Sequence, residues 1–522
     1  MHFAMRFTKV IKGLAKRADA LFEGTAYRRQ GTGVYWVNLQ PVRRPIGSER
    51  WRKGRNSMQL EYLGLKQISG PLVILEGMKD ASFEEMVEIT VNNEEKRIGK
   101  IIEIEGDIAV IQVFEGTSDI SLTNTKVRPL GHSLQIPLSG EILGRIFDGV
   151  GRPIDGLGEV FPDVKWDVNG TPINPVSREY PRNYIQTGIS AIDGLTTLIR
   201  GQKLPIFSGN GIPHDALAVQ IVRQAQLARE EDAEFAIVFA AMGVKHDVAD
   251  YFRESFQNSG VLERVVMFLN LANAPVVERV VTPRCALTVA EYLAFQRDMH
   301  VLVILTDMTS YAEALREISS LKGEIPSRKG FPGYLYSDLA SIYERAGMLK
   351  NKKGSVTQIP ILTMPNDDIT HPIPDLTGYI TEGQVVLDRS LHQRGVYPPV
   401  IVLPSLSRLM KDGIGEGFTR EDHPAIANQL FASYARVQEA RALASVIGED
   451  ELSDIDQKYM AFGRAFEQEF VSQHKEEKRL MEETLETGWR LLGLLPREEL
   501  DRVDANMLDK YYRPYDNARG EL

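Results

Sequence analysis

The sequence has almost no cysteine and no long apolar run. Its single cysteine, Cys285, rules out an internal disulfide framework and fits a reducing compartment. Nowhere in the 522 residues do eighteen or more apolar residues follow one another, so we expect no segment to span a membrane. Solenoid-length repeats and low-complexity tracts are also missing. With 43% hydrophobic and 25% charged residues, the composition is that of an ordinary globular protein of two to four domains. Any membrane role would come through partners.

Acidic residues are scarce only at the start of the chain. Residues 1–57 hold thirteen lysines and arginines against three acidic residues, a net charge of +10. Because the whole chain carries −10, residues 58–522 carry −20. An acidic body is poorly suited to grip nucleic acid over a broad surface, so we expect no nucleic-acid partner.

The basic segment 1–57 allows three interpretations. A basic amphipathic helix from Phe7 to Phe22 would suit a targeting segment. Clustered arginines would also suit an arm that binds nucleic acid or anionic lipid. We favour the third interpretation, an unstructured extension before a folded chain that begins near Met58, because composition alone is weak evidence for targeting.

Two kinds of strand pattern follow. From 58 to 132, short apolar runs such as 71–75, 88–91 and 108–113 are broken by turn residues, which predicts a small β-barrel or sandwich. The turn-rich stretch 144–153 indicates the exit from this domain. From 133 to 400, strands alternate with helical patterns, which is typical of a parallel sheet with crossover helices. The expected strands, whose near-continuous apolar runs suit burial on both faces, are 204–207, 235–239, 265–269, 301–305 and 357–362.

Helical patterns occur both within the central domain and after it. A helix is predicted over Ala216–Arg229, directly after the first central strand. Residues 401–515 are expected to form a helical C-terminal domain. There, an apolar stripe that we interpret as a core face consists of Phe462, Phe466, Phe470, Leu480, Leu485, Trp489 and Leu492. The fold class is therefore β, then α/β, then α.

The loop after the first central strand lacks the chemistry of a phosphate site. A phosphate-binding loop has the pattern G-x-x-x-x-G-K-[ST], in which backbone N–H groups and lysine bind phosphates and the hydroxyl binds Mg²⁺. Here Ser208 and Pro213 replace the glycines, and His214 replaces the lysine. Asp215 replaces the hydroxyl and would repel a phosphate, while Pro213 has no N–H to donate. Weak or no phosphate binding is therefore expected at Ser208, Gly209, Asn210, Gly211, Pro213, His214 and Asp215.

Other positions of a nucleotide site are partly kept. Asp307 follows a predicted strand, where nucleotide-binding folds hold Mg²⁺, although a helix cap would explain it equally well. Val244 stands where a catalytic glutamate would polarise water, and Lys245 keeps a positive charge beside it. Arg408 is either an ordinary surface arginine or an arginine finger, which stabilises transition-state charge on a neighbour's γ-phosphate.

Four long strings are more specific than any of these short motifs. They are GEIPSRKGFPGY at 323–334, ILTMPNDDITHP at 361–372, DLTGYITEGQ at 375–384 and YPPVIVLPSLSR at 397–408. The strings resemble the non-catalytic B subunit, called the beta chain in prokaryotes, of V-type and archaeal-type rotary ATPases. The resemblance runs from about residue 60 to 515.

This resemblance implies a β-barrel, a RecA-like nucleotide-binding domain and a helical domain. It also implies that three such chains alternate with three catalytic A subunits in a ring on the cytoplasmic side of a membrane. Central and peripheral stalks would connect the ring to a sector that moves H⁺ or Na⁺. ATP or ADP with Mg²⁺ would bind at the interface with the catalytic subunit, and this chain alone would bind no nucleotide tightly and no metal. The family's weakened loop falls on Ser208–Asp215, and its arginine finger falls on Arg408.

Two alternatives remain. One is a self-sufficient RecA-like NTPase of the flagellar-export or Rho type, which would need the lysine, hydroxyl and glutamate that this chain lacks. The other is a scaffold without a role in its neighbour's chemistry.

Overall fold

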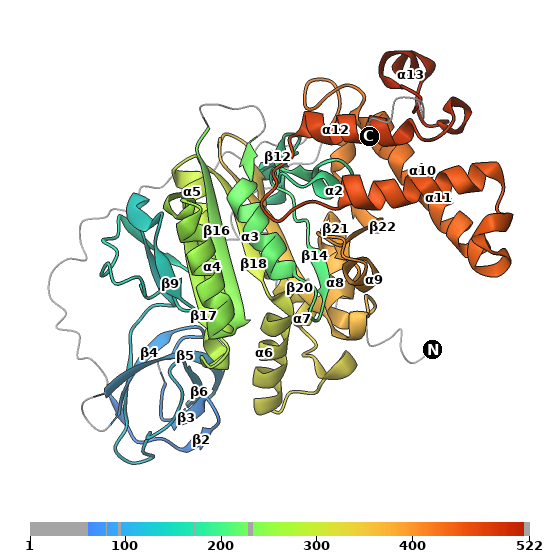
Figure 1. Cartoon of the computed structure of the whole chain (residues 1–522). Helices are drawn as coiled ribbons and strands as arrows, with labels where there is room; N and C mark the ends of the chain where they lie inside the picture. Colours follow the sequence, from blue (N-terminus) through green and yellow to red (C-terminus); the bar gives the residue numbers. More distant parts are fainter. Residues whose placement is uncertain (1–60, 80, 92–94, 171–172, 228–232, 516–522) are drawn as a thin grey trace, which may run out of the picture. The chain divides into compact units, whose positions relative to one another are not determined.

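The computed structural model describes residues 61–79, 81–91, 95–170, 173–227 and 233–515 (Figure 1). The predicted basic extension 1–57 lies outside the described residues. In the part of the chain that is described, no helix combines the length and apolar character needed to cross a membrane.

The N-terminal domain is an antiparallel sheet, and its strands coincide with the apolar runs seen in the sequence. The strand order is β1-β7-β4-β5-β6-β3-β2. Alternate side chains of β4 point into a core that also receives β3, β6 and β7, which explains why short alternating runs are sufficient here. The strands are β1 (Tyr62–Leu63), β2 (Gln67–Ser69), β3 (Leu72–Glu76), β4 (Met86–Val91), β5 (Glu95–Glu105), β6 (Ile108–Val113) and β7 (Lys126–Pro129).

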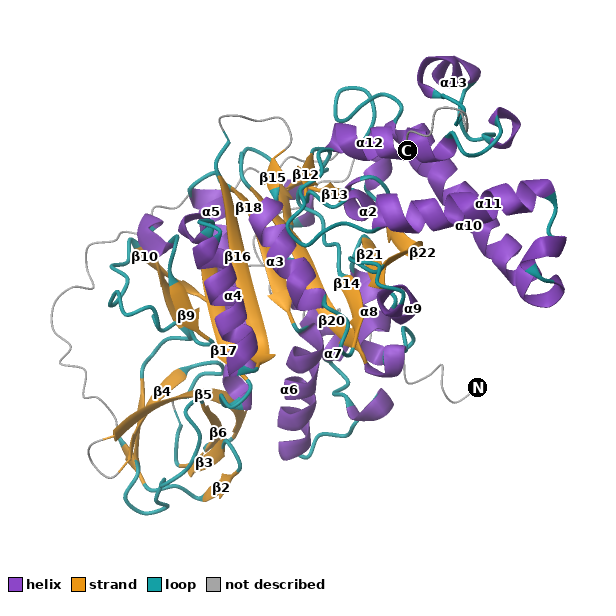
Figure 2. Ribbon diagram, viewed as in Figure 1, coloured by secondary structure: helices purple, strands orange, loops and turns teal. Residues whose placement is uncertain are grey.

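The central domain is built on a mostly parallel sheet with the order β22-β21-β14-β20-β18-β16-β17-β9 (Figure 2). Along this order all neighbouring pairs are parallel except β21 with β22. Beside it, β19 (Gly347–Leu349) pairs antiparallel with β20, and β11 (Arg178–Glu179) pairs antiparallel with β19. The strands are β9 (Ile146–Asp148), β14 (Ile206–Gly209), β16 (Phe235–Val244), β17 (Val265–Leu271), β18 (His300–Thr306), β20 (Ser355–Met364), β21 (Gly383–Leu387) and β22 (Val400–Ser407).

Both faces of this sheet are covered by helices. Along β16, Ile237 and Phe239 pack into one apolar core with α3 (His214–Gln224) and α4 (His246–Asn258). The alternate residues Ala236 and Val238 pack into a second core. That core also contains α5 (Val276–Gln296), α6 (Met308–Leu321) and α7 (Leu335–Tyr343). Burial on both faces explains the near-continuous apolar runs, and the prediction of doubly buried strands is confirmed.

Three local expectations need correction. The helix predicted over Ala216–Arg229 is α3, which begins two residues earlier and ends at Gln224. Directly after it, β15 (Gln226–Leu227) pairs with β12 (Tyr184–Gln186), so tertiary pairing overrides the helical pattern. The stretch 144–153 is more than an exit turn, because it contains β9, which pairs with β17 at the sheet edge. The helical domain expected over 401–515 begins later than predicted, because the central sheet continues through β22 to Ser407.

The C-terminal part is helical. Phe462, Phe466 and Phe470 are buried, and their rings stack 5.7 and 5.2 Å apart, so the aromatic stripe is a core face as predicted. Leu480 is the exception. It is 42% exposed because it precedes α12 and does not lie within it. The elements are α10 (His423–Ile447), α11 (Asp454–Ala465), a π-helical turn (Phe466–Val471), α12 (Met481–Leu492) and α13 (Ala505–Tyr511).

A buried carboxylate joins this helical part to the central domain. The Glu467 side chain is 6% exposed and accepts hydrogen bonds from Arg441 (2.7 Å) and Tyr434 (2.6 Å) of α10. It also pairs at 2.6 Å with Arg394, which follows α9 (Arg389–Gln393) of the central domain. Two guanidinium groups and a phenol therefore bind the same carboxylate, which connects the helical part to the central domain.

Glu467→Gln should lower the free energy of unfolding by about 1–3 kcal/mol at neutral pH. It removes the charge that both arginines pair with, and the magnitude is discounted because both are partly exposed. The matched control is Glu469→Gln, which loses a more exposed pair with Arg490 and should cost about 0.5 kcal/mol or less. Denaturant unfolding of the purified chain measures both, and equal losses would contradict the central position of Glu467.

The effect of Glu467 should also depend on pH. Burial would raise the pKa of Glu467, but hydrogen bonds from Arg441, Tyr434 and Arg394 outweigh burial and leave this pKa below its usual value. Such a carboxyl stabilises the fold above its unfolded pKa of about 4.3, and this stabilisation is lost as pH falls through the folded pKa. The difference between the wild type and Glu467→Gln should therefore shrink below about pH 4. A difference that stays constant from pH 7 to pH 3 would contradict this.

Candidate functional site

The loop between β14 and α3 lies at the carboxyl edge of the central sheet. Strand β14 is flanked by β20 and β21, and all three run in the same direction. Their carboxyl ends therefore meet at one edge, where ligands bind in open α/β folds. The sequence-predicted loop thus occupies the position of a phosphate loop in the fold.

Inside this loop, Ser208 and His214 bind to each other. The Ser208 side chain is fully buried, and its Oγ lies 3.1 Å from His214 Nδ1. The same Nδ1 lies 3.0 Å from the carbonyl oxygen of Ile212, a distance that suits an N–H donor at this nitrogen. His214 Nε2 lies 3.6 Å from Asp215. The side chain that replaces lysine therefore bonds within the loop.

An ion pair from the two neighbouring strands closes over the loop. Asp367 follows β20, and Arg389 is the first residue of α9 after β21. Arg389 Nε and Nη2 donate to the two Asp367 oxygens at 2.6 and 2.9 Å, and Nη2 also donates to the Asn210 carbonyl at 2.8 Å. The Asp367 carboxylate lies so close to Gly209 that a Cβ there would collide with it. A carboxylate of the chain itself thus lies against the backbone of the loop at Gly209.

Two more carboxylates lie behind the loop. Asp307 caps α6 by accepting hydrogen bonds from the N–H groups of Thr309 (2.8 Å) and Thr363 (3.1 Å), so the cap explanation holds. Burial raises the pKa of Asp215, the neighbouring His214 imidazole lowers it, and the negative charge of Asp307 raises it further. Two acids that repel each other here would repel a phosphate as well.

The residues of this loop do not fit a bound nucleotide. Pro213 offers no N–H, His214 bonds within the loop, and Asp367 lies against Gly209. At the end of β16, Val244 offers no group that could accept a proton, and the exposed Lys245 begins the turn into α4. This loop therefore lacks the groups that a phosphoryl-transfer step needs.

The structure does not bring Arg408 to this loop. Arg408 follows Ser407, which ends β22 and pairs with Gly383 at the beginning of β21. Because β22 runs antiparallel to β21, Arg408 lies at the amino edge of the sheet, opposite the loop. Four residue steps of β21, from Gly383 to Leu387, separate the two edges, roughly 13 Å at the usual rise per residue. No arginine side chain spans that distance, so Arg408 cannot serve its own chain's loop.

The backbone of Arg408 is fixed, whereas its side chain is exposed and makes one long hydrogen bond. Its N–H donates to the Glu382 carbonyl at 2.8 Å. Its guanidinium makes a long hydrogen bond of 3.4 Å to the Thr381 carbonyl, and the residue is exposed. An exposed guanidinium on a fixed strand end suits a partner that approaches from outside the chain.

Two residues at the loop were missed by sequence reasoning. Asp367 and Arg389 lie 158 and 180 residues beyond Gly209, and only the strand order makes them neighbours. Asp367 did carry one signal, because it is an acidic residue just after a predicted strand.

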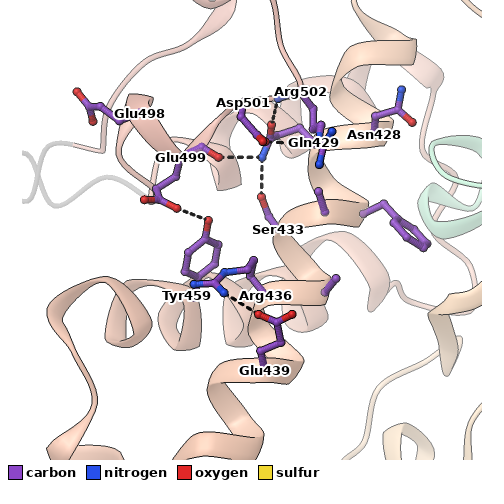
Figure 3. A pocket seen from close by; sticks show the side chains of 13 residues that line it. Asn428, Gln429, Ser433, Arg436, Glu439, Tyr459, Glu498, Glu499, Asp501 and Arg502 are labelled. Carbon is purple, nitrogen blue, oxygen red and sulfur yellow. Dashed lines mark hydrogen bonds and ion pairs between the residues drawn. The ribbon is translucent and has the colours of Figure 1, made fainter.

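A separate cavity of about 800 Å³ lies in the helical part, between α10, α11 and the short helix Arg497–Glu499 (Figure 3). Its side chains pair with one another, Arg436 with Glu439 at 2.6 Å and Tyr459 with Glu499 at 2.8 Å. None of the site residues predicted from the sequence lines it.

Comparisons with known proteins cover nearly all of the described chain. The family model for the ATP synthase alpha/beta family, nucleotide-binding domain, matches residues 188–407. The beta-barrel domain of the same family matches residues 65–131, and the C-terminal domain of V and A type ATP synthase matches residues 412–512. These confirm the predicted succession of a β-barrel, a nucleotide-binding domain and a helical domain.

Individual relatives agree. The chain is 63% identical over 460 residues to the V-type ATP synthase beta chain of Halothermothrix orenii, which covers 88% of this chain and 99% of that protein. It is 61% identical over 457 residues to V-type ATP synthase beta chain 2 of Clostridium tetani, covering 87% and 99%. Among solved structures, the ATP synthase subunit NeqB from Nanoarcheaum equitans has a TM-score of 0.65 and 40% identity, covering 82% of this chain and all of that one. The chain therefore belongs to the family of V-type ATP synthase beta chains.

Proposed function

We propose that this chain is a non-catalytic subunit of a rotary ATPase or ATP synthase that lends Arg408 to the ATP site of a neighbouring catalytic subunit. Three copies would alternate with three catalytic subunits in a ring. ATP or ADP with Mg²⁺ would bind mainly to the neighbour, and Arg408 would stabilise charge on the γ-phosphate as it is transferred.

The observation that carries this proposal is the separation of the two sites. The loop closed by Asp367 and Arg389 lies at the carboxyl edge of the sheet, while the exposed Arg408 lies at the amino edge. An exposed arginine that cannot reach its own loop is available to another chain. In a ring, opposite edges of one subunit can face different neighbours, as an arginine supplied in trans requires.

The self-sufficient NTPase fits these contacts poorly. Such an enzyme would need an open loop, a lysine for the phosphates and a base for water. Here the loop is closed, His214 bonds within it, and Val244 lies in the position of the base. A scaffold without a role in chemistry would leave the exposed guanidinium of Arg408 unexplained.

Membership of the family supports the proposed setting. The ring would lie on the cytoplasmic side of a membrane as a peripheral head, joined by central and peripheral stalks to a membrane sector that moves H⁺ or Na⁺. This chain would act on ion movement only through the ring.

Arg408→Ala should lower kcat of the reconstituted ring by about 10³–10⁵-fold while leaving assembly intact, because the transition-state charge loses its guanidinium. Steady-state ATP hydrolysis measures the loss, and size-exclusion chromatography checks assembly. Lys411→Ala, which removes an exposed cation from the same region, should keep wild-type activity. Near-normal turnover by an assembled Arg408→Ala ring would overturn the proposal.

Asp367→Asn should make the loop a better anion site. It removes the charge beside Gly209 and frees Arg389, so the affinity of the isolated chain for inorganic pyrophosphate should rise about tenfold. Asp368→Asn is the matched control, because that carboxylate pairs with Lys329 and not with Arg389. Isothermal titration calorimetry measures both. An unchanged affinity in Asp367→Asn would show that the ion pair is not what closes the loop.

A further inference from the structure

The strand end that carries Arg408 is tied to the segment that leads into the degenerate loop. The link is Gln202, which lies between β13 (Leu198–Ile199) and β14 and is fully buried. Its Nε2 donates to Ser407 Oγ at 2.9 Å and to the Glu382 carbonyl at 3.2 Å. That carbonyl is also the one that accepts the Arg408 N–H.

Every hydrogen-bonding group in this link is used. Gln202 Oε1 accepts the N–H of Ile199 at 2.9 Å, which fixes the orientation of the amide and directs both of its N–H bonds at acceptors. Ser407 Oγ, in turn, donates to the Thr197 carbonyl at 3.0 Å. Buried polar groups that are fully satisfied hold one geometry, because any displacement leaves one of them without a partner.

An ion cluster fixes the other side of the same corner. Lys203 is 6% exposed, and its Nζ lies 2.8 Å from both Glu344 and Glu382. Its backbone N–H donates to Glu382 at 2.8 Å. Gly383 allows the backbones of β21 and β22 to approach closely at this point, because a Cβ there would collide with the Leu406 carbonyl. Two sets of contacts, those of Gln202 and those of Lys203, therefore fix Glu382 and Ser407 next to Arg408.

We infer that Gln202 and Ser407 are positioning residues that set the place of Arg408 in the neighbouring subunit's ATP site. This inference rests on the proposed function of Arg408. It gives the segment before β14 a role in a chain whose loop does not fit nucleotide. Gln202 in that segment holds the end of β22, which carries Arg408. A catalytic group displaced by about 1 Å can cost on the order of a hundredfold in rate.

Ser407→Ala in the reconstituted ring tests this. It removes the hydroxyl that links Gln202 to Thr197, and kcat should fall about tenfold to a hundredfold while KM stays within about twofold. Ser407→Thr keeps the hydroxyl and should restore kcat to within about threefold of the wild type. Ser405→Ala is the matched control, because its hydroxyl bonds to Ile401 and Val386 on the same strand pair and does not contact Gln202. It should leave kcat within about twofold.

A second substitution tests the same link from its other end. Gln202→Glu keeps the acceptor for Ile199 and removes the amide donors to Ser407 and Glu382. Because it buries a carboxylate, its kcat is compared only in rings that size-exclusion chromatography shows to be assembled, where it should reproduce the kcat loss of Ser407→Ala. Wild-type kcat in both variants would overturn the inference. Equal losses of kcat in Ser407→Ala and Ser405→Ala would also overturn it, since they would indicate general weakening of the strand. If Arg408→Ala itself kept full activity, the proposed function would fail instead.

Discussion

The position of β14 between β20 and β21 is the constraint on which the rest of the structure depends. Parallel pairing on both sides brings three carboxyl ends to one edge. Asp367, which follows β20, and Arg389, which follows β21, therefore meet above the loop that follows β14. The antiparallel return of β22 carries Arg408 to the other edge. One set of strand pairings thus closes the chain's own loop and exposes the group proposed to act elsewhere.

The two edges differ in how firmly they are held. At the amino edge, Gln202 and Lys203 are buried or nearly so, and each makes several hydrogen bonds or ion pairs at 2.8–3.2 Å. At the carboxyl edge, Asp367 and Arg389 remain about two-fifths exposed, where ion pairs contribute little to stability. The firmer edge carries Arg408. This difference agrees with the proposal that the chain contributes the charge of Arg408, held in a fixed position, and that its own loop binds no nucleotide.

Much of the fold follows from the sequence because burial leaves a strong pattern. The apolar runs of β16, β17 and β18 predicted doubly buried strands, and Phe462, Phe466 and Phe470 predicted a core face. Local pattern failed where tertiary pairing decided the outcome, as at β15 and at β9.

The candidate site was predictable in part only. The missing lysine, hydroxyl and glutamate are visible in the sequence, and long strings shared with a family pointed to Arg408. The contacts of Asp367, Arg389 and Gln202 were not visible, because each joins segments that lie far apart in the chain. Strand order created these contacts, and nothing in local composition records strand order.

The most direct test of the account is a structure of the assembled ring trapped with ADP, Mg²⁺ and aluminium fluoride. We predict that the Arg408 guanidinium lies within hydrogen-bond distance, about 3 Å, of the fluoride held by the neighbouring subunit. We also predict that no phosphate lies on Ser208–Asp215. A trapped nucleotide on that loop, with Arg408 facing solvent, would contradict the central claim.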